Sequence, residues 1–216
     1  MKKLFVISIL TLFASVGYGQ QDLKAKEILE KVTKTTQSLP SIEAKFAFEM
    51  SNKKEGISEK SSGTIVLKDK KYKLSIPPMG LQVYCDGKSI WTYMLHANEV
   101  SVSNLDEETD DLMDPVRIFT IYERGFNYKY LGESVDLGVP VYNIDLIPQQ
   151  SNGEIHSIKL MINKQKMLIH GAHMTGKDGN QYNVSIKEFK TDGVFKDSDF
   201  VFNPTLHKGV EVVDLR

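Results

Sequence analysis

The sequence predicts a mainly β protein with helices, an α+β chain built on a curved antiparallel sheet. Two observations predict this class. Between residues 63 and 105, apolar residues recur at every second position in several successive runs. Successive side chains of a strand point to opposite faces, so such runs are strands with one buried face. Similar short runs, joined by turn sequences, continue from residue 128 to the end, which favours a sheet that is curled or nearly closed.

Residues 1–19 have the three parts of a secretory signal peptide: a basic start, an apolar run at 4–16 and small residues before the cut. The apolar run is shorter than the about 20 residues of a membrane-spanning helix, although an uncleaved anchor stays an alternative. We expect cleavage before Gln20 and a single exported domain at 20–216.

Composition bounds the function of this domain. The chain has 216 residues, of which 41% are hydrophobic and 25% charged, enough for a substantial core. The net charge of −1 argues against nucleic acid as a partner, because nucleic acid requires a concentrated positive surface. Cys85, the only cysteine, lies within a strand pattern and is expected to be a small buried residue rather than a nucleophile.

The first element after the signal peptide is a helix at 22–38. Asp22 is its expected N-cap and Pro40 follows its end. Its apolar stripe at helical spacing consists of Ala25, Ile28, Leu29, Val32 and Thr36. A strand with one buried face follows, carrying Ile42, Ala44, Phe46 and Phe48, and then a polar hairpin from Asn52 to Ser62.

The central meander turns at Asp86-Gly87, a strong hairpin signal because glycine supplies the positive φ that such turns need. Two strands precede this turn: Tyr72, Leu74 and Ile76 share a face of the first, and Leu81, Val83 and Cys85 share a face of the second. The return strand carries Ile90, Trp91 and Tyr93, and a second turn at His96–Asn98 leads to Val100 and Val102.

A second helix is expected between the two blocks of strands. An acidic run at 106–111 lacks the spacing of a calcium loop and is interpreted as a solvated approach to it. Asp114 and Pro115 suit its start and Gly125 its end. Its apolar residues are Val116, Ile118, Phe119 and Tyr122.

The second block of strands shows the same alternation. Its expected strands carry Tyr142, Ile144 and Leu146; Ile158, Leu160 and Ile162; residues 167–174; and Tyr182, Val184 and Ile186. Turns are expected at Asn152-Gly153 and at 177–180, and Phe200 and Phe202 precede a closing segment at 209–214.

No catalytic motif, phosphate loop or dinucleotide fingerprint is present, so neither an enzyme nor a cofactor is predicted. His170 and His173 are three residues apart on a strand, which places them on opposite faces and disfavours a shared metal ion. The lysines of 68–73 are either an anionic docking patch or protection of a strand edge.

Several stretches, in order over nearly the whole mature chain, are shared with one family. They are Ile42–Phe46, Gly63–Lys68, Asp86–Tyr93, Asp114-Pro115, Phe200–Pro204 and Gly209–Arg216. The pattern Asp-Gly-x-x-x-Trp-x-Tyr and the Gly-Val ending are the most specific parts. With these motifs the chain resembles the periplasmic outer-membrane lipoprotein carrier (LolA-like) family.

The resemblance implies an incomplete β-barrel with a helical lid over a cavity for acyl chains. It implies a monomeric periplasmic shuttle that takes acylated lipoproteins from an inner-membrane ATP-driven exporter towards an outer-membrane acceptor. The chain departs from the family at Phe48, where glutamine is frequent. It also has Lys68-Asp69 where well-studied members carry an arginine that bonds to the lid. Either Lys68 replaces this arginine as a weaker donor, or the lid is held by apolar contact alone.

The candidate lining of an apolar pocket combines the alternating faces and the second helix. These residues are Leu74, Ile76, Leu81, Val83, Trp91, Tyr93, Ile118, Phe119 and Tyr122. Periodicity leaves open whether the concave face is filled by its own side chains or hollow. Two other functions stay open: a periplasmic sensor or adaptor that holds a lipid-bearing protein, and a hydrolase acting on lipid or glycan.

Overall fold

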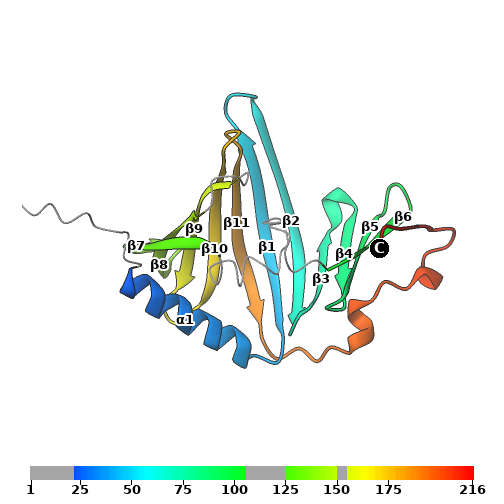
Figure 1. The fold of residues 1–216 in the computed structure, drawn as a ribbon, viewed down its shortest axis with the longest axis horizontal. Coiled ribbons are helices and arrows are strands. Elements are labelled where there is room, and N and C mark those ends of the chain that lie inside the picture. Colours follow the sequence, from blue (N-terminus) through cyan, green and yellow to red (C-terminus); the bar gives the residue numbers. More distant parts are fainter. Residues whose placement is uncertain (1–21, 106–124, 150–154) are drawn as a thin grey trace, which may run out of the picture.

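The computed structural model describes residues 22–105, 125–149 and 155–216, which contain one α-helix and one twelve-stranded sheet (Figure 1). The helix α1 is Leu23–Ser38. The strands are β1 Ile42–Asn52, β2 Ile57–Lys68, β3 Lys71–Ile76, β4 Leu81–Cys85, β5 Ser89–Met94, β6 Glu99–Asn104, β7 Phe126–Asp136, β8 Val139–Pro148, β9 Ile155–Asn163, β10 Leu168–Gly176, β11 Gln181–Lys190 and β12 Glu211–Asp214. Short 3₁₀ turns are η1 Pro77–Met79, η4 Asp197–Phe200 and η5 Pro204–Leu206.

The sheet has the order β12-β6-β5-β4-β3-β2-β1-β11-β10-β9-β8-β7 and does not close into a barrel. All neighbouring strands are antiparallel except β12, which lies parallel to β6. In Figure 1 the long β1–β2 hairpin stands in the middle, and β7 at one end runs across its direction. The predicted α+β class with a curved, incompletely closed sheet is confirmed. The helix expected from Asp114, and with it the lid, lies outside the described residues.

Helix α1 lies across one end of the β7–β10 half of the sheet (Figure 1). One carboxylate oxygen of Asp22 accepts hydrogen bonds from the N–H groups of Lys24 and Ala25, at 2.9 and 3.1 Å, which confirms the predicted N-cap. The other oxygen accepts the N–H of Tyr130 on β7 at 2.9 Å. The Asp22 side chain therefore both caps the start of α1 and links the helix to β7, an edge strand of the sheet.

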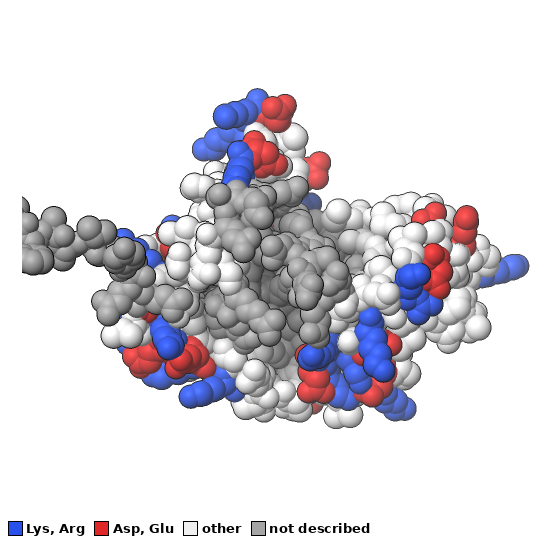
Figure 2. All heavy atoms as spheres, in the orientation of Figure 1, with Lys and Arg blue, Asp and Glu red and all other residues white. Residues whose placement is uncertain are grey.

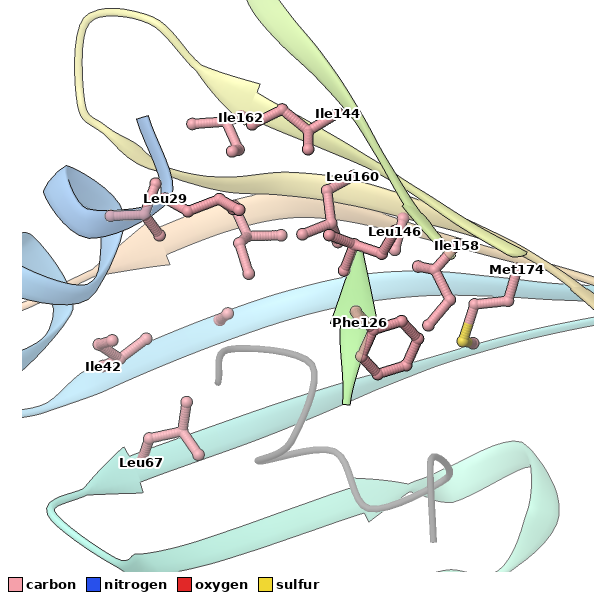
Figure 3. Packing of buried hydrophobic residues seen from close by; sticks show 14 of the residues in the cluster. Leu29, Ile42, Leu67, Phe126, Ile144, Leu146, Ile158, Leu160, Ile162 and Met174 are labelled. Atoms are coloured by element: carbon pink, nitrogen blue, oxygen red, sulfur yellow. The ribbon is translucent and has the colours of Figure 1, made fainter. Parts of the chain in front are cut away.

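The core lies on the face of the sheet that α1 covers (Figure 3). The predicted helix stripe is buried at Ala25, Ile28, Leu29 and Val32, while Thr36 is only half-buried. From the sheet, the same cluster contains Ile42, Ala44, Ile65, Leu67, Tyr72, Leu74, Cys85, Phe126, Ile144, Leu146, Ile155, Ile158, Leu160, Ile162, Ile169, Ala172 and Met174. Residues paired across neighbouring strands share a face. We call the face that carries Ile65 and Leu74 the core face, and the opposite one the outer face.

The outer face is covered at the β3–β6 end by the C-terminal segment, residues 191–210. Phe200 is fully buried and Phe202 is 4% exposed. The ring of Phe202 lies 5.7 Å from that of Tyr84 and 5.1 Å from that of Tyr93, centroid to centroid. His207 stacks on Phe202 at 4.6 Å. Offset and edge-on aromatic contacts of this kind stabilise beyond their buried area, so the segment is firmly attached.

Within the described residues the turns follow their predicted residues, whereas the turn expected at Asn152-Gly153 lies outside them. A side-chain oxygen of Asp86 accepts the N–H groups of Lys88 and Ser89, and Gly87 has φ +90°, which confirms the hairpin between β4 and β5. The predicted polar hairpin at 52–62 is also present. Its return strand β2 begins at Ile57, because the long β1–β2 ladder extends to the pair Asn52–Ile57. Asn52 holds this end by donating to the side chain of Asn180 at 2.9 Å.

Candidate functional site

The middle of the core face is apolar and only partly buried. Phe46 and Phe48 on β1 pair with Ile186 and Val184 on β11, and all four side chains are half-buried. The rings of Phe48 and Tyr182 stack with centroids 6.2 Å apart. By contrast, Ile144, Leu146, Ile158, Leu160 and Ile162 on β8 and β9 have no exposed area. The core face is therefore fully packed at β8–β9, whereas the apolar side chains of its middle, on β1 and β11, are partly exposed.

The backbone of β2 makes room for one of these rings. A Cβ added at Gly63 would lie 2.7 Å from the ring of Phe46 and 2.5 Å from the carbonyl oxygen of Ser75. Phe46 and Gly63 are paired across β1 and β2, so the ring lies over the glycine. Glycine is required here for the close approach of ring and strand, rather than for an unusual φ.

Charge is absent from the same part of the face. At Ala44, Phe46 and Phe48, and at the residues paired with them on β2 and β11, no charged side chain lies on the core face among the described residues. In Figure 2, lysine, arginine and acidic side chains gather at the tip of the β1–β2 hairpin, along α1 and near the C-terminal segment. An uncharged, partly exposed apolar surface is typical of a site for an apolar ligand.

Four of the predicted lining residues lie together on the core face. Leu74 pairs with Val83 and Ile76 pairs with Leu81 across β3 and β4. Leu74 is buried, whereas the other three are half-buried. Ile90 on β5 pairs with Cys85 and extends the same surface. The predicted lining lacked Ile90, Phe46, Phe48 and Tyr182, although their alternation was visible in the sequence.

The placement of Trp91 and Tyr93 beside these residues was wrong. Trp91 pairs with Tyr84 and Tyr93 pairs with Gln82, which puts both on the outer face. The reason is register: the turn at Asp86 pairs Cys85 with Ile90, so the next residue points away from the core. Tyr93 packs on Phe202, and its hydroxyl donates to the side-chain oxygen of Asn98 at 3.1 Å. Ile118, Phe119 and Tyr122 lie outside the described residues.

Lys68, Lys71 and Lys73 of the lysine-rich stretch 68–73 also belong to the outer face. Lys68 donates to the carbonyl oxygen of Phe195 at 2.8 Å, and Lys71 forms an ion pair with Asp197 at 2.7 Å. Protection of a strand edge is excluded, because β2 and β3 have neighbours on both sides. The prediction that Lys68 acts as a weaker donor to the lid involves residues outside the described parts of the chain. Among the described residues, the partners of Lys68 are in the C-terminal segment, on the other face of the sheet from Leu67.

Ionisable groups in the described parts of the chain hold structural positions. Burial raises the pKa of Tyr84, and the N–H of Tyr130 is the main cause that lowers the pKa of Asp22. Cys85 is fully buried, as predicted, and its sulfur accepts the N–H of Gly87 at 3.4 Å. His170 Nε2 lies 2.9 Å from Asp136 Oδ2, and His173 contacts the Asn183 side chain.

Among the residues with described positions, no group of three histidine, cysteine or acidic side chains could hold a metal ion. Within the same residues, no helix has the length and apolar character needed to cross a membrane.

Comparison with known proteins gives the chain a family. A family model described as "Outer membrane lipoprotein carrier protein LolA" matches residues 37–203. No match was found among curated protein sequences. An uncharacterised conserved protein from Thermus thermophilus superposes with a TM-score of 0.62 at 15% identity, over 88% of this chain and 99% of the other.

Two further solved structures are similar at lower scores. A putative outer membrane lipoprotein-sorting protein domain from Vibrio parahaemolyticus has a TM-score of 0.46 and 12% identity, over 86% of this chain and 98% of its own. The Mycobacterium tuberculosis lipoprotein LppX has a TM-score of 0.46 and 13% identity, over 81% and 98%. Because the family model covers most of its length, this protein belongs to the LolA family of outer membrane lipoprotein carrier proteins.

Proposed function

We propose that this protein is a periplasmic carrier that shields the acyl chains of lipoproteins and shuttles them from the inner to the outer membrane. The observation that carries the proposal is the middle of the core face. There Phe46, Phe48, Ile76 and Val83 are half-buried on an uncharged surface, in a chain of the lipoprotein carrier family. Side chains that keep apolar surface in water gain free energy when an apolar ligand covers them.

The physical need for such a carrier follows from the cost of exposing acyl chains. Each buried methylene is worth about 0.8 kcal/mol, so a chain of about 16 carbons resists transfer into water by roughly 12 kcal/mol. A lipoprotein with several chains therefore requires cover in an aqueous compartment. The carrier has to form this cover without chemistry and release it again, which suits contacts that are apolar and incomplete.

The proposed site takes the predicted residues that lie on the core face and adds their neighbours. It consists of Leu74, Ile76, Leu81, Val83, Ile90, Phe46, Phe48, Tyr182 and Ile186.

The helix from Pro115, with Ile118, Phe119 and Tyr122, remains proposed as a lid. Residues 1–19 are proposed as a cleaved signal peptide before one domain at 20–216. Loading energy would come from an ATP-driven exporter in the inner membrane, and an outer-membrane acceptor would receive the cargo.

Binding and release without turnover is the test of this function. Purified mature protein is titrated with a naphthylamine dye, and a triacylated lipopeptide is added to displace it. We expect dye fluorescence to rise on binding and to fall as the lipopeptide competes, with intact acyl esters recovered afterwards. Failure of both dye and lipopeptide to bind would contradict the carrier, and release of free fatty acid would favour a hydrolase.

Transfer separates a carrier from a sensor or adaptor. Protein loaded with lipopeptide is mixed with acceptor liposomes, and the lipopeptide remaining on the protein is measured after the liposomes are removed. A carrier gives up its cargo to an excess of lipid, whereas retention of the lipopeptide would favour a sensor. Intact mass spectrometry of protein from its own cells checks the cut before Gln20, and a mature chain that begins at Met1 would contradict a periplasmic shuttle.

A further inference from the structure

A cavity lies on the outer face, away from the proposed acyl site. It measures about 490 Å³, lies between β1–β3 and the C-terminal segment, and is open to solvent. Its lining consists of Glu43, Thr64, Val66, Lys73, Ser75, Val194, Phe195, Asp199 and Phe200. This volume is within the range of about 300–1,000 Å³ that small-molecule sites occupy. We call this cavity the outer groove.

The C-terminal segment that forms one wall of the outer groove is attached to the sheet at several points. Ser41 donates to the carbonyl oxygen of Gly193 at 2.8 Å. Lys68 donates to the carbonyl oxygen of Phe195, and Asp197 is paired with Lys71. Phe200 is fully buried. These contacts fix the position of the segment over the strands, so the groove is part of the fold.

The wall formed by the sheet places opposite charges on either side of an apolar residue. Glu43 pairs with Val66 across β1 and β2, and Val66 pairs with Lys73 across β2 and β3. Two strand spacings separate Glu43 from Lys73, a backbone distance of about 10 Å. Glu43 lies 3.9 Å from Lys190, the outer limit of an ion pair, and the Lys73 ammonium lies 5.0 Å from the centre of the Tyr84 ring.

Two hydroxyl groups complete the polar part of the groove. Thr64 and Ser75 are paired across β2 and β3, one row from the charged pair. Within the described parts of the chain, neither hydroxyl makes a hydrogen bond. The strands β1, β2 and β3 are paired on both sides, so a ligand cannot add to them as an extra strand. Recognition in the groove therefore depends on side chains.

We propose that the outer groove binds a short zwitterionic peptide, a dipeptide with apolar side chains, with its ammonium group at Glu43 and its carboxylate at Lys73. An extended dipeptide spans about 7 Å, which suits charged partners separated on the order of 10 Å. Thr64 and Ser75 would bond its amide. Its apolar side chains would contact Val66, Val194 and Phe195.

Calorimetric titration of the mature protein with leucyl-phenylalanine tests this proposal. The matched probe is the same dipeptide with an acetylated N-terminus and an amidated C-terminus, which has the same apolar body but no charges. We expect the free dipeptide to bind and the blocked one to bind at least about tenfold more weakly, because each charge-assisted bond is lost. Glu43→Gln and Lys73→Met should each weaken the free dipeptide by a similar factor.

Lys45→Met is the matched control, since Lys45 lies on the same face but is exposed and outside the groove lining. It should leave dipeptide affinity unchanged, and none of the three variants should alter displacement of dye by lipopeptide. Amide shifts of the wild-type protein on adding dipeptide should concentrate at 64–66, 73–75 and 194–200, which requires no variant to fold. Equal binding of the blocked dipeptide, shifts centred on the core face, or absence of binding at millimolar dipeptide would each overturn the proposal.

Discussion

The two faces of the β3–β5 meander are built from alternating residues of the same strands, yet they have opposite characters. The core face carries Leu74, Val83 and Ile90, which are aliphatic and belong to one large cluster. The outer face carries Tyr84 and Trp91, which pack beneath Phe202 and the C-terminal segment. The core face is part of one continuous apolar cluster and keeps some apolar surface exposed. The outer face is covered by the C-terminal segment of the same chain.

Sequence motifs that resemble the family include residues of the outer face, whereas the residues proposed to bind cargo lie on the core face. The pattern Asp86-Gly87 to Tyr93 and the segment Phe200–Pro204 are far apart in sequence, yet Tyr93 and Phe202 are in contact. These motifs therefore maintain the attachment of the C-terminal segment. The proposed acyl site consists of aliphatic and phenyl side chains whose only requirement is to be apolar, and such positions leave a weak signature in a sequence.

The largest expected effect comes from disrupting the packing of the C-terminal segment, residues 191–210, on the outer face. We call this packing the outer closure. Phe200→Ala removes a fully buried ring, and truncations of this kind cost about 3–5 kcal/mol of unfolding free energy. Val201→Ala is the control, because Val201 is 38% exposed and its loss should cost roughly 0.5 kcal/mol or less. Urea unfolding followed by circular dichroism measures both. Similar stability of the two variants would mean that the outer closure is peripheral to the fold.

The next effect tests the tightest packing on the core face. Gly63→Ala would place a methyl group against the Phe46 ring and the Ser75 carbonyl, and overpacking of this kind costs about 1–3 kcal/mol. Because the ring has to move, we also expect weaker dye binding at the core face. Ser62→Ala, at the exposed neighbouring position, is the control for unfolding and for dye fluorescence. An unchanged dye titration for Gly63→Ala would place the ligand away from Phe46.

Adjacent residues on β5 allow the two faces to be compared directly. Ile90 and Trp91 are both half-buried, on the core and outer faces respectively. Ile90→Ser should weaken lipopeptide binding by about three- to tenfold, since part of an aliphatic contact worth about 1.5–3 kcal/mol is lost. Trp91→Leu should leave that affinity unchanged, as measured by dye displacement.

Trp91 also reports on its own face, because it is the only tryptophan of the chain. Its emission should stay the same when lipopeptide binds the core face of the wild-type protein. A large shift in emission, or a stronger loss of affinity for Trp91→Leu than for Ile90→Ser, would reverse the assignment of the two faces.

The sequence was sufficient to predict the elements in which apolar residues recur with a clear helical or strand period. The helix stripe from Ala25 to Val32 and the alternation on β8 and β9 predicted their buried residues, because burial of one face imposes that period. Asp86-Gly87 gave its turn because the conformation requires those residues. The curved and unclosed sheet was predictable as a class from the number and spacing of these strands.

Faces were harder to predict than strands. Leu81 and Val83 were assigned correctly, but Trp91 and Tyr93 were not, since an aromatic residue suits a core and an aromatic outer cluster equally well. The register that decides between them comes from pairing across the turn. The hairpin at 52–62 was predicted, but the start of strand β2 at Ile57 was not located, because residues 57–62 have little apolar period. Its polar residues are in a strand because β1 beside it supplies a full ladder.

The smallest expected effect concerns the link between α1 and the edge strand β7. The Tyr130 N–H, followed by those of Ala25 and Lys24, holds the pKa of Asp22 below its ordinary value of 3.8. A lowered folded-state pKa means that the carboxylate stabilises the fold above pH 3.8 and loses this contribution as pH falls through the folded-state value.

In Asp22→Asn, the amide oxygen can still cap the helix, but the NH₂ group that replaces the second oxygen cannot accept the Tyr130 N–H. We therefore expect Asp22→Asn to melt roughly 2 °C below wild type at pH 7, with the difference shrinking as pH falls below 3.8. Other lowered carboxyls, such as Asp197 beside Lys71, titrate in both proteins and cancel from the comparison. A melting difference that stays constant from about pH 7 to about pH 2.5 would show that the charge of Asp22 has no part in the attachment of α1 to the sheet.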